Sequence, residues 1–132
     1  MTPLVLVVDD DSSIRAVTEI ALTRLAGWRV ITAERGRAAI DLAREHHPSV
    51  ILMDLMMPEM DGVEAARILL GDAGTADIPV VLLTARSTMG GEDPPWVGVP
   101  VCGVIAKPFD PTILAQEIVD LVGWSDVYIA DD

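Results

Sequence analysis

The chain has 132 residues, of which 51% are hydrophobic and 23% are charged. This length and composition fit one globular domain with its own core, and they exclude a chain that is disordered throughout. Nine basic and 21 acidic side chains give a formal net charge of −12, which repels phosphate backbones and argues against binding of DNA or RNA.

Targeting and redox features are sparse. No apolar run reaches the roughly 18 residues needed to span a bilayer, and the N-terminus lacks the layout of a secretory signal. Cys102 is the only cysteine, so no disulfide can form within the chain, and its apolar neighbours predict a buried, unreactive thiol. We therefore expect a cytoplasmic protein with no membrane association.

Five apolar runs of strand length alternate with segments of helical periodicity. Their content of Val, Ile and Leu is typical of parallel strands that are covered on both faces. The predicted strands are residues 4–8, 28–33, 50–53, 78–83 and 101–106. Helices are expected from Ser13 to a cap at Gly27, around residues 39–43 and 63–69, and from Asp110-Pro111 to Leu121.

This alternation predicts an α/β fold with a doubly wound, five-stranded parallel sheet and right-handed crossovers. The domain is expected to take residues 1–124, followed by a short acidic tail, residues 125–132, that is poorly ordered. In residues 86–100, consecutive glycines and three prolines disfavour a helix. We expect the fourth helix to be shortened or replaced by a loop that Trp96 anchors.

Charged or polar side chains follow four of the predicted strands. Asp9 and Asp10 follow the first strand, Asp54 the third, Thr84 the fourth and Lys107 the fifth. Ligands of such sheets bind beyond the carboxyl ends of the strands, where these groups should gather. Two carboxylates about 4 Å apart repel by roughly 4 kcal/mol at an effective dielectric near 20, so the cluster requires a cation, bound protons or screening by water. The oxygen-rich set suits Mg²⁺.

The same groups suit phosphoryl transfer. With a divalent cation nearby, Asp54 stays ionised and can attack phosphorus to give an aspartyl phosphate. The Lys107 ammonium and the Thr84 hydroxyl can then meet the charge on the phosphoryl oxygens. Asp11, the third consecutive aspartate, is expected to be a solvated residue near the start of the first helix.

The motifs "VVDD", "MDLMMPEMDG", "LLTA" and "AKPF", within residues 4 to about 123, resemble the receiver domain of two-component response regulators. The resemblance implies the CheY-like, flavodoxin-like strand order 2-1-3-4-5. It also implies that Asp54 is the phosphoacceptor and that Asp9, Asp10, Asp54 and the main-chain carbonyl of Met56 hold Mg²⁺. Thr84 and Lys107 would contact the phosphoryl group, and the bond before Pro108 would be cis.

The resemblance further implies partners. A histidine kinase or phosphotransfer protein would donate the phosphoryl group, and an unidentified downstream protein would receive the signal by direct contact. The chain would not be an enzyme beyond its own phosphorylation and dephosphorylation. We expect either a single-domain regulator or a receiver cut from a longer protein.

The sequence departs from the family at its output region. Many receivers carry an aromatic residue three positions before the lysine, and its rotamer reports phosphorylation. Val104 stands there and has no comparable swing. Met56 and Arg86 occupy positions that tune dephosphorylation in the family, and their bulk predicts a long-lived phosphoryl group. Either the 86–100 loop reorders on phosphorylation around Trp96, or it replaces the helix without switching.

Two other functions are compatible with parts of the sequence. A phosphate-independent scaffold, or pseudo-receiver, fits Val104 and the missing helix, but the complete set of strand-end residues argues against it. A small Mg²⁺-dependent phosphatase of the haloacid dehalogenase type also uses Asp, Thr and Lys. Such enzymes place the nucleophile in an Asp-x-Asp pattern after the first strand, which this chain lacks.

Overall fold

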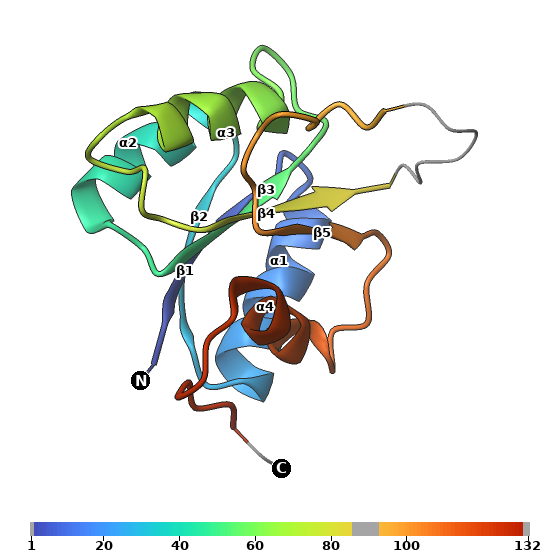
Figure 1. Cartoon of the computed structure of the whole chain (residues 1–132). Helices are drawn as coiled ribbons and strands as arrows, with labels where there is room; N and C mark the ends of the chain where they lie inside the picture. The colour runs from blue at the N-terminus through green and yellow to red at the C-terminus, as the bar shows by residue number, and fades with distance from the viewer. Residues whose placement is uncertain (1, 86–92, 131–132) are drawn as a thin grey trace.

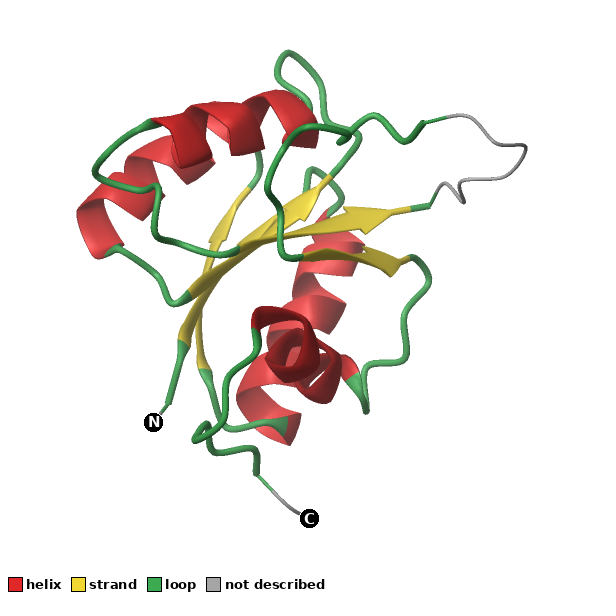
Figure 2. Cartoon of the chain, viewed as in Figure 1, coloured by secondary structure: helices red, strands yellow, loops and turns green. Residues whose placement is uncertain are grey.

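A computed structural model describes residues 2–85 and 93–130, and it contains one parallel sheet between two layers of helices (Figures 1 and 2). The strands are β1 (Leu4–Val8), β2 (Arg29–Ala33), β3 (Val50–Asp54), β4 (Val80–Thr84) and β5 (Gly103–Ala106). The helices are α1 (Ser12–Ile20), continued by the π-helical turn η1 (Ala21–Leu25), α2 (Gly36–His46), α3 (Gly62–Gly71) and α4 (Leu114–Val122). The strand order β2-β1-β3-β4-β5 confirms the predicted doubly wound sheet.

The two helical layers cover opposite faces of the sheet. Helices α2 and α3 lie on one face, and α1, η1 and α4 lie on the other (Figure 1). Every residue of the central strand β3 and of its neighbour β4 is buried. Because both faces are covered, these strands consist of continuous apolar runs and not of alternating residues.

The first helix begins as its sequence indicates and ends in an unexpected way. The Asp11 carboxylate accepts hydrogen bonds from the main-chain N–H groups of Ser13 and Ile14, at 2.8 and 3.2 Å, and so caps α1. The π-helical turn η1 was not foreseen from the periodicity. Gly27, at a φ of 78°, stands where the cap was predicted, and its N–H donates to the carbonyl of Thr23.

Between β4 and β5, described residues 93–102 form turns and no helix. The N–H of Val97 donates to the Pro94 carbonyl, and that of Val99 to the Trp96 carbonyl, both at 3.0 Å. Trp96 is half-buried and packs with Val99 against the core on the α2–α3 side. This segment therefore covers part of the sheet in place of a full helix. The remainder, 86–92, which includes Arg86, lies outside the described residues.

The prediction of a poorly ordered tail is wrong for residues 125–130. The Trp28 indole N–H donates to the Tyr128 carbonyl at 2.5 Å, and the Ala130 N–H donates to the Ala26 carbonyl at 2.8 Å. Val127 and Ile129 pack against the core on the α1–α4 side. Alternating apolar residues in this acidic segment are the physical reason that it docks.

Two local predictions also need correction. Regular helix in α4 begins at Leu114, because the Asp110 carboxylate bonds the N–H and hydroxyl of Thr112 and makes a turn there instead of capping a helix. Cys102 is exposed, not buried. It immediately precedes β5, which is an edge strand with a neighbour on one side alone.

None of the helices in the described part of the chain is both long and apolar enough to cross a membrane.

Candidate functional site

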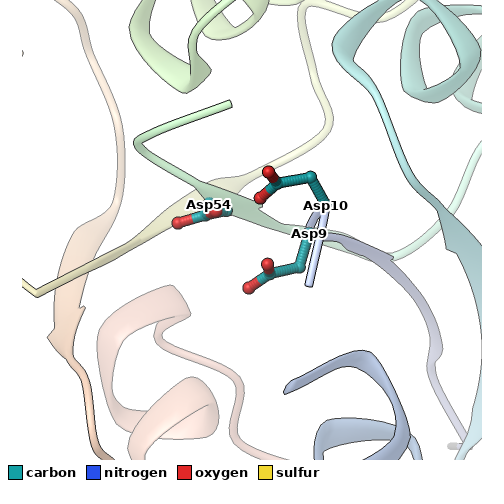
Figure 3. Close-up of side chains that lie close together, drawn as sticks. All are labelled: Asp9, Asp10 and Asp54. Carbon is teal, nitrogen blue, oxygen red and sulfur yellow. The ribbon is translucent and has the colours of Figure 1, made fainter. Parts of the chain in front are cut away.

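Three carboxylates meet at the carboxyl edge of the sheet. Asp9 and Asp10 follow β1, and Asp54 is the last residue of the neighbouring strand β3. One oxygen from each carboxylate lies within 4.8 Å of the others, and Figure 3 shows the side chains converging. Asp9 is 0% and Asp54 4% exposed, whereas Asp10 is exposed. The predicted acidic cluster is therefore present, with two of its three members buried.

Lys107 joins this cluster from the loop after β5. Its ammonium lies 3.0 Å from Oδ2 of Asp9 and 2.9 Å from Oδ1 of Asp54. The main-chain N–H of Lys107 donates to the Thr84 carbonyl at 2.8 Å, which continues the β4–β5 ladder past the end of β5. The lysine side chain is 15% exposed, so these ion pairs are shielded from water.

Thr84 and Met56 take different positions around Asp54. Thr84 ends β4, the strand beside β3, and is buried. Met56 lies two residues beyond Asp54, with its side chain 63% exposed, and its main-chain N–H donates to the Asp54 carboxylate. The structure therefore brings all the predicted strand-end residues to one edge of the sheet.

The charge balance of the site shifts two titrations. Burial raises the pKa of Asp54 to about 6, and the negative charge of Asp9 adds to this, although the hydrogen bond from Lys107 opposes it. Burial alone would lower the pKa of Lys107, but its hydrogen bonds to Asp54 and Asp9 outweigh burial and raise it. Lys107 therefore stays protonated, and Asp54 is mostly ionised at neutral pH.

The donor set fits Mg²⁺. Three carboxylates face one ammonium, so the cluster keeps an excess of negative charge and offers only oxygen donors. A hard divalent cation with several water ligands suits carboxylates at the mouth of a site. Asp10, which is exposed, leaves one side of the cluster open to solvent.

The remaining predicted residues lie around this centre. The Lys107–Pro108 bond is cis, as expected. Val104 is a half-buried residue of β5 that packs, as Trp96 does, against the core on the α2–α3 side of the sheet. Neither Val104 nor Trp96 contacts the carboxylates through any hydrogen bond or ion pair of the described residues.

Two residues near the site were missed from the sequence. A Cβ atom at Gly62 would lie 2.2 Å from the main-chain oxygen of Asp54, so only glycine lets α3 begin against the end of β3. The "MDG" segment carried that signal, since glycine follows the capping residue Asp61. Arg15 contacts the main chain of Asp9. Its position six residues after Asp9 gave no distinct signal.

The sequence model of the response regulator receiver domain matches residues 5–119. The chain belongs to this family. DivK of Brucella ovis, a polar-differentiation response regulator, is 37% identical over 94 residues, which are 70% of this chain and 75% of DivK. The chain spans about half the length of the curated transcriptional regulators that it also matches.

Solved receiver structures share the fold. The chemotaxis protein CheY4 of Vibrio cholerae superposes with a TM-score of 0.80 at 28% identity, over 92% of this chain and 99% of CheY4. The receiver domain of the sensor histidine kinase PA1611 from Pseudomonas aeruginosa gives a TM-score of 0.81 at 27% identity, over 94% of this chain and 100% of that domain. That structure has a magnesium ion coordinated in its active-site cleft.

Proposed function

We propose that this receiver accepts a phosphoryl group on Asp54 from the phosphohistidine of a histidine kinase or phosphotransfer protein. The observation that carries the proposal is the placement of the Lys107 ammonium between the buried carboxylates of Asp54 and Asp9, at 2.9 and 3.0 Å. This arrangement keeps a nucleophilic carboxylate beside a fixed positive charge. Both are needed when the charged phosphoryl group arrives.

The chemistry is a displacement at phosphorus. An oxygen of the ionised Asp54 carboxylate forms a P–O bond while the P–N bond to the donor imidazole breaks, and the departing nitrogen takes up a proton. Lys107 and the Thr84 hydroxyl would hold the phosphoryl oxygens. The products are an aspartyl phosphate and a neutral histidine, so the chain would be a signalling phosphoacceptor and not an enzyme with turnover on a separate substrate.

Mg²⁺ would be held by the carboxylates of Asp9, Asp10 and Asp54 and by the main-chain carbonyl of Met56. When bound, it supplies charge neutralisation that favours the ionised nucleophile and the phosphoryl oxygens. The close carboxylates and the magnesium in the cleft of the PA1611 receiver support this assignment.

An apolar surface on α1 and η1 supports docking of a phosphodonor protein. Val17, Ile20 and Leu25 are each exposed by a third or more, and Ile113 beside α4 is 49% exposed. Contiguous exposed apolar side chains mark protein contacts. Val17 lines a pocket together with Lys107 and Pro108, so a partner bound at this end of the surface would bring its phosphohistidine close to Asp54. We place this exchange in the cytoplasm, where the exposed Cys102 thiol would stay reduced.

The output of the phosphorylated chain would be a contact with a downstream protein through the 86–100 region. Trp96 and Val104 pack against the same core cluster on the α2–α3 side of the sheet, which supports a coupling between this region and β5. With Trp28 and Trp124 replaced by Phe, we expect phosphorylation to change Trp96 fluorescence. A spectrum that is indifferent to phosphorylation would support a loop that replaces the helix without switching, or a phosphate-independent scaffold.

The deciding experiment measures intact mass after incubation with acetyl phosphate and Mg²⁺. We expect one phosphoryl adduct on the wild-type chain, lost in Asp54→Asn and after chelation of the metal. Asp41→Asn, which changes an exposed aspartate of α2, is the matched control and should label normally. No adduct on the wild type, under conditions that label another receiver, would refute the proposal and favour the scaffold.

A further inference from the structure

Arg15 links the ends of two strands beside the acidic cluster. Its Nη1 donates to the main-chain carbonyl of Asp9 at 2.7 Å, and its Nη2 pairs with the Glu34 carboxylate at 3.2 Å. The arginine side chain is 17% exposed, although it belongs to a surface helix, whereas Glu34 is 69% exposed. The guanidinium is therefore held against the chain where β1 ends.

Asp10 lies between residues that are held by several contacts. Oδ1 of Asp9 accepts a hydrogen bond from the N–H of Asp11 at 2.9 Å, and the N–H of Asp9 donates to the Ala33 carbonyl at 3.1 Å. Among the residues that the structure describes, none makes a hydrogen bond or ion pair with the Asp10 carboxylate. The direction of this side chain therefore depends on the main chain that carries it.

We propose that Arg15 is a positioning residue, which holds the Asp9 carbonyl so that the Asp10 carboxylate faces Asp54 and can bind Mg²⁺. The peptide between Asp9 and Asp10 is planar, so a hydrogen bond to its carbonyl fixes the plane from which the Asp10 Cα projects. Figure 3 shows the resulting direction, with the Asp10 carboxylate turned toward Asp54. The inference rests on the proposed function, because it concerns the same metal site.

The charge of Arg15 and its hydrogen bond to Asp9 act on Mg²⁺ affinity in opposite directions, which can be tested. A guanidinium near a Mg²⁺ site repels the ion, so loss of the charge alone would strengthen binding of Mg²⁺. Loss of the hydrogen bond to Asp9 would instead weaken binding, because the Asp10 ligand would no longer be held in place. The two effects have opposite directions, and we expect the second to dominate.

The experiment is calorimetric titration of the folded chain with Mg²⁺ alone, without any phosphodonor. We expect Arg15→Met, which keeps much of the length of the side chain but none of its donors, to raise the dissociation constant for Mg²⁺ by about 10-fold. Arg15→Lys keeps the charge and one donor and should recover part of the loss. At saturating Mg²⁺, the rate of labelling by acetyl phosphate should return to near the wild-type rate, which separates positioning from chemistry.

Arg35→Met is the matched control. Arg35 also forms an ion pair, with Glu59 at 2.6 Å, but its side chain is far more exposed than that of Arg15 and does not bond the Asp9 carbonyl. This variant should change the dissociation constant by less than about twofold. If Arg15→Met does not fold, Glu34→Ala, at an exposed site, removes the group that orients Arg15 and should weaken Mg²⁺ binding in the same direction.

Unchanged or tighter Mg²⁺ binding in Arg15→Met, or in Glu34→Ala where that variant replaces it, would overturn the inference and leave the proposed function intact. A wild-type chain that neither binds Mg²⁺ nor accepts a phosphoryl group would overturn both. The calorimetric readout does not depend on phosphorylation, so the two failures can be told apart.

Discussion

The surroundings of Asp54 in the fold disfavour its ionised, negatively charged form. The side chain is 4% exposed and lies near Asp9, and the hydrogen bonds from Lys107 and from the Met56 main-chain N–H compensate only in part. A pKa of about 6, against 3.8 for an unperturbed aspartate, means that the folded chain binds a proton at Asp54 more tightly than the unfolded chain does. The site is therefore built at the expense of stability, as is common where a protein binds a cation or performs chemistry.

The first prediction concerns Asp54→Asn in the absence of divalent cations. We expect the neutral side chain to raise the free energy of unfolding at pH 7.5 by about 1–3 kcal/mol, because it removes the cost of the ionised group. The destabilisation by Asp54 is complete above its folded pKa of about 6 and is relieved as the pH falls toward 3.8. Urea unfolding at several pH values measures the difference.

The difference in unfolding free energy between Asp54→Asn and the wild type should therefore shrink from pH 7.5 to pH 4. Asp41→Asn, at an exposed position of α2, should show little change at either pH. A lower stability of Asp54→Asn at pH 7.5 would mean that the pair with Lys107 outweighs burial.

Met56 provides a second prediction at this scale. Its exposed side chain lies two residues beyond Asp54, where it can hinder a water molecule that approaches the phosphoryl group. We expect Met56→Ala to shorten the lifetime of the aspartyl phosphate by up to about tenfold, or about 1.4 kcal/mol in the barrier. Loss of radioactive label from the isolated phosphoprotein measures the rate. Val97→Ala, at another exposed apolar position, should leave it unchanged.

Among the elements, the C-terminal segment and the 93–102 segment both cover apolar surface without regular structure. The first packs Val127 and Ile129 on the α1–α4 side, and the second packs Trp96 and Val99 on the α2–α3 side. Each is a stretch of chain whose apolar residues are few but well placed. Packing of this kind depends on residues that are distant in sequence, so local periodicity does not predict it.

The third prediction is that removal of residues 125–132 destabilises the domain. Truncation leaves the buried Trp28 indole N–H without its partner, the Tyr128 carbonyl, and uncovers the apolar surface under Ile129. A buried donor without a partner costs about 1–3 kcal/mol, so we expect at least that loss of unfolding free energy. Trp28 emission in a chain with Trp96 and Trp124 replaced by Phe should also shift to longer wavelength.

Tyr128→Ala is the control for the truncation, because the Tyr128 side chain is 59% exposed and its main-chain carbonyl is retained. It should unfold close to the wild-type midpoint. An equal loss in both variants would assign the stabilisation to the tyrosine ring and not to the docked main chain.

For the whole molecule, the net charge of −12 sets the range of partners. It raises the cost of approach to any polyanion and favours proteins that present basic side chains around an apolar contact. The exposed apolar residues of α1 and η1 lie among Arg15, Glu19 and Arg24, which are charges of both signs. Charge and apolar exposure together therefore favour a protein partner.

The fourth prediction is that this chain does not bind duplex DNA. Non-specific binding by basic proteins has dissociation constants of about 10⁻⁴ to 10⁻⁶ M, and it depends on release of counterions by Lys and Arg. We expect no electrophoretic mobility shift at chain concentrations of about 10⁻⁵ M, even at low salt. A basic DNA-binding domain on the same gel is the control. A salt-dependent mobility shift by this chain would contradict the prediction and would indicate a local basic surface in spite of the net negative charge.

Much of this fold could be predicted because its signals are local. Apolar runs such as residues 4–8 and 50–53 mark strands that are covered on both faces. The carboxyl ends of parallel strands share one edge, so the sequence alone predicts that Asp9, Asp54 and Lys107 lie close together. Glycine and proline in residues 86–100 excluded a long helix there, and the turns of the described part agree.

Other features were decided by tertiary contacts. Cys102 is exposed because β5 lies at the edge of the sheet. Residues 125–130 dock on the domain because the indole N–H of Trp28, one hundred residues earlier, donates a hydrogen bond to the Tyr128 carbonyl. The contact of Arg15 with the Asp9 carbonyl depends on how α1 packs beside β1. By itself the sequence indicated the strands and the charged and polar groups that follow them, from which the site is predicted. Only the tertiary structure decided which groups are buried, which pairs form and which main-chain atoms are held, because burial and pairing join residues that are distant along the chain.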